Sequence, residues 1–397
     1  MTSMKSSGSG KFPVQSCCLI LMCVTVFIST GCRKPVFEET DLFISGTNGY
    51  DTYRIPSLIT TKTGALLAFC EGRKNGQEDS GDIDLLFKRS TDGGKTWSAQ
   101  KVIWDDGKNV CGNPCPVVDL ETGTIWLLMT WNNGSDNEMT IDLGLSRDTR
   151  RVFICSSKDD GLTFSKPVDI TSSVKPGLWR WYATGPGRGI QLQTGTKMGR
   201  LVVPCNHSTA FLTFGAHVIF SDDHGKTWHY SETIGGGANE SQVVELADGD
   251  LMMNMRIQWL GKGYRGISRS EDGGETWTKF VYDMTLPDPV CQASIIRYSL
   301  AGKTGRDRLL FSNPATGGRN GMTARLSYDE GDTWTISKLI YSGPSAYSCL
   351  TVMPDKSIGL LYEKGDYGTI SLARFNLAWL TDSKDYGDAA YPFLIEN

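Results

Sequence analysis

The sequence predicts an all-β fold, a six-bladed β-propeller, from two patterns that repeat along the chain. The first is an eight-residue box with a serine, an aspartate, a glycine, a threonine and an aromatic residue at fixed offsets. It occurs five times, at intervals of roughly fifty to seventy residues, the size of one supersecondary unit. The second is a short polar turn followed by an apolar run, which occurs six times. A unit of this size cannot bury its own sheet face, so the copies must pack together, and a propeller does this while protecting the sheet edges.

Each box predicts a hairpin turn. The aspartate carboxylate can accept hydrogen bonds from backbone N–H groups ahead of it, the glycine can take a positive φ, and the aromatic ring can pack the turn onto the sheet. The five boxes are residues 90–97, 157–164, 221–228, 270–277 and 327–334.

The polar turns predict the number of blades, because each of the first five precedes a box. They are residues 62–67, 121–126, 197–202, 247–252, 305–310 and 355–360. After the sixth turn, residues 381–385 lack the glycine, threonine and tryptophan of a box. We therefore expect the last blade to be completed by a strand from the other end of the chain. A β-sandwich with similar hairpins is the alternative, but five near-identical turns favour the propeller.

The first 31 residues predict a signal peptide. Lys5 and Lys11 precede an apolar run over residues 18–28 that is too short to span a membrane. The following Ser29-Thr30-Gly31-Cys32 resembles a lipoprotein cleavage box, with Ser29 where that pattern has leucine. We expect residues 32–40 to form a tether and residues 41–397 to form the propeller. Cys32 would attach an exported protein to a membrane at the periplasm or cell surface; ordinary cleavage and secretion is the alternative.

The composition describes an ordinary soluble globular chain and excludes some functions. The 397 residues include 40 Lys and Arg against 44 Asp and Glu, and no basic run points to nucleic acid. The chain has only four histidines, which disfavours a histidine-rich zinc site or a Ser-His-Asp triad. We expect no metal and no cofactor. Seven cysteines follow Cys32, mostly in apolar runs typical of buried free thiols. Pairing of Cys111 with Cys115 stays open, and a monomer is favoured.

Polar residues at strand ends point to one axial site. The inner strand of every blade runs along the central axis, so residues that open a blade converge at one mouth. The five that would meet there are Arg54, Glu240, Arg256, Arg319 and Tyr347. Arg73 ends another strand, and Asp79 follows it by six residues in a loop. Each residue alone has an ordinary structural explanation, whereas the combination indicates a site.

The chain resembles the exo-α-sialidase (neuraminidase) family from about residue 38 to 385. The resemblance rests on the Tyr53-Arg54-Ile55-Pro56 motif, the five boxes and the order of the blade-opening residues. It implies that Arg54, Arg256 and Arg319 bind the carboxylate of sialic acid, and that Arg73 lies near the ring substituents. It also implies Tyr347 as nucleophile, Glu240 as its carboxylate partner and Asp79 as acid/base. Asp82 and Asp84 lie nearby, and Asp79 is selected because its spacing from Arg73 fits the family pattern.

The implied chemistry is self-consistent. Three planar guanidinium groups can hold a carboxylate bidentately, and a neutral tyrosine can attack an anomeric carbon that carries a carboxylate without like-charge repulsion. The expected reaction is hydrolysis of terminal α-linked sialic acid from glycans, with retention. Transfer of the sugar, release of an anhydro product and a non-catalytic glycan-binding propeller remain alternatives. Trp131, Trp179, Trp181 and Tyr182 are candidates for a sugar platform or for ordinary packing.

Overall fold

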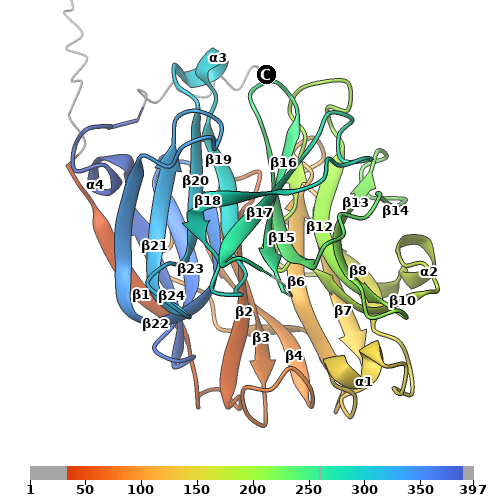
Figure 1. Ribbon diagram of the computed structural model, residues 1–397. Helices are drawn as coiled ribbons and strands as arrows, with labels where there is room; N and C mark the ends of the chain where they lie inside the picture. Colours follow the sequence, from red (N-terminus) through yellow and green to blue (C-terminus); the bar gives the residue numbers. More distant parts are fainter. Residues whose placement is uncertain (1–33, 259–260, 388–397) are drawn as a thin grey trace, which may run out of the picture. The chain divides into compact units, whose positions relative to one another are not determined.

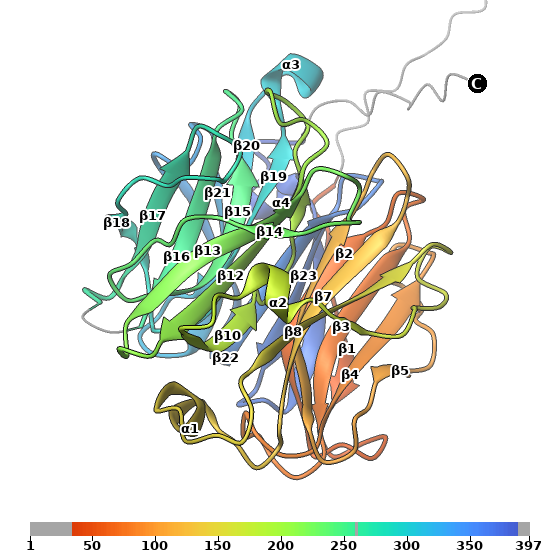
Figure 2. The same cartoon turned by 90° about the vertical axis from the view of Figure 1, so that its right-hand side faces the viewer.

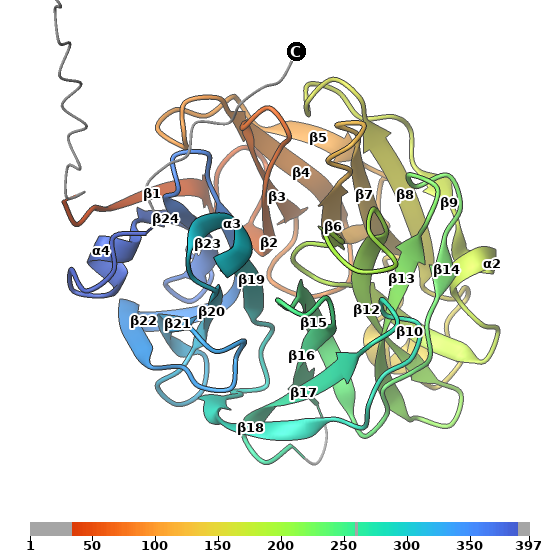
Figure 3. The same ribbon diagram turned by 90° about the horizontal axis from the view of Figure 1, so that it is seen from above.

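Antiparallel strands make up about half of residues 34–258 and 261–387, which the computed structural model describes (Figure 1). The described residues belong to one compact unit, and the expected signal peptide and Cys32 lie outside them. In the described part, no helix has the length and apolar character to cross a membrane. Viewed from above, the strands are arranged around a common centre, with β2, β6, β15 and β19 nearest to it (Figure 3). The predicted all-β propeller class is confirmed.

The strands follow one another around this centre in groups. The first group is β2 (Thr52–Thr60), β3 (Leu66–Arg73), β4 (Ile83–Ser90) and β5 (Lys101–Trp104). The second is β6 (Val110–Val118), β7 (Ile125–Asn132), β8 (Arg151–Ser157) and β9 (Val168–Asp169). The third is β10 (Trp179–Thr184), β11 (Ile190–Gln191), β12 (Leu201–Thr209), β13 (Phe214–Ser221) and β14 (His229–Tyr230).

The later strands repeat this order. They are β15 (Ala238–Glu245), β16 (Leu251–Ile257), β17 (Tyr264–Ser270) and β18 (Val281–Pro287), then β19 (Ser294–Ser299), β20 (Arg308–Pro314), β21 (Asn320–Ser327) and β22 (Ile336–Val352). The last are β23 (Ile358–Lys364) and β24 (Thr369–Phe375). Short helices lie in the connections: α1 (Glu138–Asp142), α2 (Thr171–Val174), α3 (Ala301–Thr304) and α4 (Leu377–Leu380) (Figure 2).

Hydrogen bonding joins neighbouring groups, so the groups are not separate sheets. β22 pairs with β21 along its first half and with β23 along its second half, and β4 makes one parallel pair with β6. The resulting sheets have seven, five, four and eight strands in the described part of the chain. The count of six blades therefore stays a prediction.

The first strand closes the sheet at the other end of the chain, as expected. β1 (Phe37–Ile44) pairs antiparallel with β24, from Phe37 opposite Phe375 to Ile44 opposite Thr369. Residues 37–40 were expected in the tether, so this part of the tether prediction is wrong. Their backbone is needed to satisfy the outer edge of β24, which would otherwise expose unpaired N–H and C=O groups.

The five boxes form the same turn, at the ends of β4, β8, β13, β17 and β21. In every copy the serine Oγ accepts a bond of 2.8–3.0 Å from the glycine N–H, and the threonine Oγ1 donates to the aspartate at 2.5–2.7 Å. The glycine φ lies between +79° and +93°, where a side chain would be strained. The predicted bonds from the backbone to the aspartate are also present, because in every copy the threonine N–H donates to the aspartate at 2.9–3.0 Å.

The core lies between the sheets, and its sulfur atoms are not cross-linked. Buried clusters of aliphatic and aromatic side chains fill the space between neighbouring groups of strands. The cysteines of the described part, including Cys111 and Cys115, are free and buried. Their side chains therefore serve as small apolar core groups.

Candidate active site

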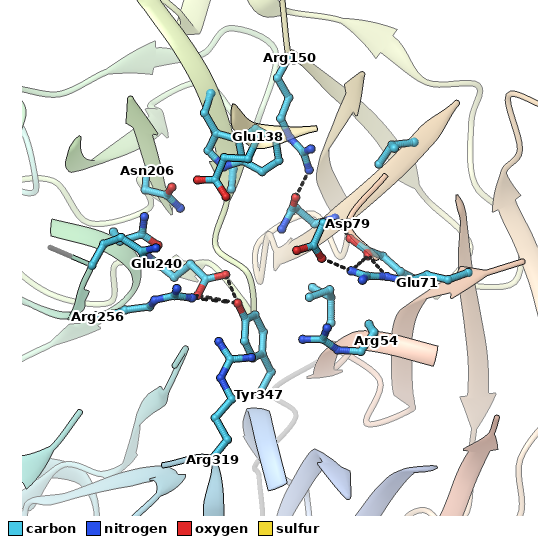
Figure 4. Close-up of a pocket in the computed structure, with 18 residues that line it drawn as sticks. Arg54, Glu71, Asp79, Glu138, Arg150, Asn206, Glu240, Arg256, Arg319 and Tyr347 are labelled. Atoms are coloured by element: carbon cyan, nitrogen blue, oxygen red, sulfur yellow. Dashed lines mark hydrogen bonds and ion pairs between the residues drawn. The ribbon is translucent and has the colours of Figure 1, made fainter. Parts of the chain in front are cut away.

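One pocket at the mouth of the central axis collects every site residue selected from the sequence (Figure 4). Its cavity volume is about 130 Å³. Its lining includes Arg54, Arg73, Asp79, Glu240, Arg256, Arg319 and Tyr347. These side chains come from β2, β3, the loop after β3, β15, β16, the start of β21 and β22. Residues distant in sequence thus meet because the strands that carry them end at the same place.

Several of these residues lie at irregularities of strand pairing. The register of β2 with β3 shifts between Arg54 and Ser57, that of β15 with β16 shifts around Glu240, and that of β22 with β23 shifts around Tyr347. A bulge bends its strand and turns a side chain away from the regular alternation. Ile55, beside Arg54, has a φ of +60°, which is strained for a β-branched residue. The local backbone is therefore shaped to aim these side chains into the pocket.

Tyr347 and Glu240 form the centre of the pocket. The Tyr347 hydroxyl lies 2.6 and 2.8 Å from the two carboxylate oxygens of Glu240. Arg256 Nη1 donates to Glu240 Oε2 at 2.6 Å and to the Tyr347 hydroxyl at 3.1 Å. Burial and the charge of Glu240 raise the pKa of Tyr347 well above its ordinary value, although Arg256 and Arg319 offset part of this. Tyr347 is therefore a neutral hydroxyl whose proton is directed at Glu240.

Arg54 and Arg319, the other two arginines that the resemblance assigns to carboxylate binding, approach the ring of Tyr347. The guanidinium carbon of Arg54 lies 5.4 Å from the centre of the Tyr347 ring, and that of Arg319 lies 5.5 Å from it. Arg54 Nε donates to Glu363 Oε1 at 2.7 Å, whereas Arg319 donates to the Tyr367 hydroxyl at 3.2 Å. Within the described residues, Arg319 makes no ion pair. Its charge is available to an anionic ligand.

Glu363 connects Arg54 to Tyr347 and was missed in the sequence. Its side chain is fully buried, and its Oε1 accepts from Arg54 and from the Ile55 N–H at 2.9 Å. Its Oε2 accepts from the Tyr347 N–H at 3.0 Å. The charge of Glu363 raises the pKa of Arg54 above its ordinary value against the opposing effect of burial. A glutamate ending the apolar run of β23 was the only sequence signal for this role.

Asp79 stands at one side of the pocket on an exposed loop. Its side chain is 70 % exposed, and its Oδ1 lies 2.7 Å from Arg73 Nη2. Arg73 is buried and also pairs with Glu71 Oε2 at 2.6 Å. Partial shielding from water by the surrounding pocket tends to raise the pKa of Asp79, but Arg73 and Arg54 outweigh it and hold that pKa below its ordinary value. Without a ligand, Asp79 is ionised.

The wall opposite Arg319 contains residues that the sequence did not indicate (Figure 4). Arg150 stacks over the Trp181 ring, with its Cζ 3.9 Å from the ring centre, and donates to Asn132 Oδ1 at 2.6 Å and to Asn113 Oδ1. Burial and the charge of Asp142 raise the pKa of Glu138, on α1, to about 7. Only the folded chain shows these residues as part of the site, because nothing in their local sequence separates them from surface residues.

The four candidate aromatic residues have different positions. Trp181 lines the pocket, whereas Trp179 and Tyr182 pack in the core with Val203. Trp131 packs against another core cluster. A platform of four rings is therefore wrong, and Trp181 is the one of the four that lines the pocket. In the described residues, no group of three or more His, Cys, Asp or Glu side chains is arranged to hold a metal ion.

Comparisons with known proteins place the chain in a family. The family model described as "BNR repeat-like domain" matches residues 64–362. The sialidase of Micromonospora viridifaciens is 38% identical over 374 residues, covering 91% of this chain and 56% of that protein. The exo-alpha-sialidase of Aspergillus fumigatus is 35% identical over 386 residues, covering 87% of this chain and 90% of that protein. The chain spans less than two thirds of the Micromonospora relative.

The chain is also similar to an anhydrosialidase and to solved structures of sialidases. The anhydrosialidase of the leech Macrobdella decora is 28% identical over 465 residues, covering 83% of this chain and 60% of that protein. Among solved structures, the Hadza microbial sialidase Hz136 has a TM-score of 0.79 at 34% identity, covering 86% of this chain and 69% of that chain. The intramolecular trans-sialidase from Ruminococcus gnavus shares the fold, with a TM-score of 0.73 at 23% identity, covering 86% and 98% of the two chains. The repeats, the fold and these relatives together show that the chain belongs to the exo-α-sialidase family.

Proposed function

We propose that this chain is an exo-α-sialidase that hydrolyses terminal α-linked sialic acid and retains its configuration through a sialosyl-tyrosine intermediate. The observation that carries the proposal is the buried Tyr347–Glu240 pair within reach of three arginines. A sugar carboxylate bound by Arg54, Arg256 and Arg319 would place its anomeric carbon over the Tyr347 hydroxyl. Sialidases with a tyrosine nucleophile depart from the usual pair of catalytic carboxylates in glycosidases.

The first step forms the bond between the sugar and the enzyme. Tyr347 Oη attacks the anomeric carbon while its proton passes to Glu240, and Asp79 donates a proton to the departing glycosidic oxygen. This requires Asp79 to be protonated. A bound carboxylate neutralises Arg54, one of the arginine charges that keep Asp79 ionised, so substrate binding itself favours protonation.

The second step releases the sugar. Asp79, now ionised, accepts a proton from water as the water oxygen attacks the anomeric carbon. The bond to Tyr347 Oη breaks, and the phenolate regains its proton from Glu240. Asp79 and Glu240 then have their initial protonation states. Two displacements on the same carbon give net retention.

The decisive experiment is fluorophore release from an aryl α-sialoside by wild type and by Tyr347→Phe. We expect turnover in the wild type and a decrease of at least about a hundredfold in the variant, with an unchanged melting temperature. An unchanged kcat in Tyr347→Phe would refute the nucleophile. Product NMR would separate free sialic acid from an anhydro sugar, and an added lactose acceptor would reveal transfer.

The cellular context of the proposed enzyme follows from the sequence. We propose that it acts outside the cytoplasm on sialylated glycans and is attached to a membrane through acylated Cys32. A Cys32→Ser variant should lose incorporation of labelled fatty acid. Incorporation equal to wild type would contradict attachment at this residue.

A further inference from the structure

A second hollow, here called the α1 groove, opens from the wall of the catalytic pocket. It shares Glu138 and Gln258 with that pocket and extends past Met139 and Leu143 on α1 to Leu212. These three apolar side chains are 71%, 52% and 51% exposed. The contrast with the pocket is sharp, since the pocket is lined largely by charged and amide groups. The groove therefore fits an apolar group that belongs to the same ligand.

The boundary between the catalytic pocket and the α1 groove, here called the threshold, carries polar groups that lack hydrogen-bond partners. Asn206 is buried and its Nδ2 has no hydrogen-bond partner among the described residues, and the same holds for the buried Oε1 of Gln258. A buried amide without a partner costs free energy unless a ligand or water supplies the bond. One unpaired donor and one unpaired acceptor suit a chain that carries hydroxyl or ester groups.

The position of the groove identifies which part of a sialoside reaches it. Glu138 lies across the pocket from Arg319, while Asp79 lies at the side of Arg73 (Figure 4). The leaving oxygen must be within hydrogen-bond reach of Asp79, so the aglycone departs on that side. With the carboxylate held by the three arginines, the ring carbons remote from it would face Glu138, and the hydroxylated three-carbon tail carried by one of them would extend towards the threshold.

We propose that the α1 groove binds a neutral acyl group esterified to the hydroxylated tail of sialic acid, so that tail-acylated sialosides are substrates. This inference rests on the proposed sialidase function. Glu138 and Asp142 both line the groove, and two carboxyl groups disfavour sulfate or phosphate esters. An acyl chain would instead cover Met139 and Leu143, and its carbonyl could accept from the Asn206 amide.

The test uses aryl α-sialosides whose terminal tail carbon carries an amide-linked acyl chain of two, four or six carbons, because amides do not hydrolyse or migrate as esters do. In the wild type we expect kcat/KM to increase with chain length, by up to about fourfold for each methylene that becomes buried. The double variant Met139→Gln, Leu143→Gln should lose this dependence and cleave the unsubstituted sialoside as wild type does. Met198→Gln is the matched control, because Met198 is also an exposed methionine (69%) and lies outside the groove.

A second series carries the alkyl chain on the aglycone. If chain length there, and not on the tail, is sensitive to the Met139 and Leu143 substitutions, the groove binds the aglycone and the inference is wrong. It is also wrong if kcat/KM falls with tail length equally in wild type and the double variant.

Loss of the proposed function would be seen separately, as failure to cleave the unsubstituted sialoside. In that case, calorimetry with the methyl α-sialosides of the tail series still tests the groove. Tighter binding of longer chains by wild type but not by the double variant would retain the inference, and equal affinity would refute it.

Discussion

The outer turns and the axial pocket are built in opposite ways. The bonds among the serine, aspartate, glycine and threonine that shape each box join residues within four positions of each other, as between Thr276 and Asp272, and they are the same in five copies. The pocket joins residues far apart in the chain: Tyr347 and Glu240 are 107 positions apart, and Arg54 and Glu363 are 309 apart. The residues that form the pocket are not part of a pattern that recurs from one group of strands to the next. Local, repeated bonds thus establish the architecture, and unique long-range bonds establish the chemistry.

This difference predicts that damage to the pocket changes activity with little effect on stability, and the largest effect is expected at Glu240. Glu240→Gln keeps the shape of the side chain but removes the base that accepts the Tyr347 proton. We expect kcat to fall by about 10²–10⁴, with a melting temperature within a degree or two of wild type. Steady-state kinetics and calorimetry measure both quantities. A large loss of stability with little change in kcat would show that Glu240 is mainly structural.

The next largest effect is expected at Arg319, which contributes binding and no proton transfer. Arg319→Ala removes a clamp cation worth roughly 2 kcal/mol, which corresponds to an increase in KM of about thirtyfold. The matched control is Arg269→Ala, since Arg269 pairs with Asp332 away from the pocket. An unchanged KM in Arg319→Ala would remove this residue from the clamp.

A box variant should show the reverse behaviour. Asp272 accepts bonds from Ser270, Glu275 and Thr276, so Asp272→Ala leaves several donors without their partner. We expect a loss of about 1–2 kcal/mol and a melting temperature lower by a few degrees, with kcat unchanged. Asp332→Ala, at an exposed position of another box, is the control. A decrease in kcat without a change in stability would contradict the separation of the two regions.

The smallest expected effect is a difference between the two regions in how their contribution to stability depends on pH. The pKa of Glu138 is raised from 4.5 to about 7, so the folded state binds this proton more tightly than the unfolded state. Its contribution to stability is present below pH 4.5 and is lost as the pH rises through 7. Glu138→Gln should therefore melt a few degrees higher than wild type at pH 8 and close to it at pH 4.5.

The contribution of the box aspartates to stability depends on pH in the opposite direction. Hydrogen bonds from Thr163 lower the pKa of Asp159 to about 2, so its contribution is present above pH 4 and is lost as the pH falls through 2.

An exposed glutamate, Glu271, serves as the control for Glu138→Gln in the same melting series. Equal melting curves of wild type and Glu138→Gln across pH 4.5–8 would refute the assignment for Glu138.

The comparison also explains what could be predicted from the sequence. Box turns are local, so residues 270–277 specify their own hydrogen bonds and could be predicted in atomic terms. Arg54, Glu240 and Tyr347 could be selected because each lies where a blade was expected to begin, and the family resemblance supplied their expected roles. Glu363 and Glu138 could not, since their roles depend on neighbours that only the closed fold supplies. The extent of β1 was missed because pairing with β24 depends on the far end of the chain.

Glu363 has a consequence for how the protein fails on heating. One buried carboxylate holds both Arg54 and the backbone of Tyr347, and so it sets the separation between the carboxylate clamp and the nucleophile. Small thermal displacements of β2 relative to β22 must break these bonds before the separation can change. Catalytic competence and the junction between the first and last strand groups should therefore be lost in one event. Inactivation and unfolding would then have the same temperature dependence, with no inactive folded species between them.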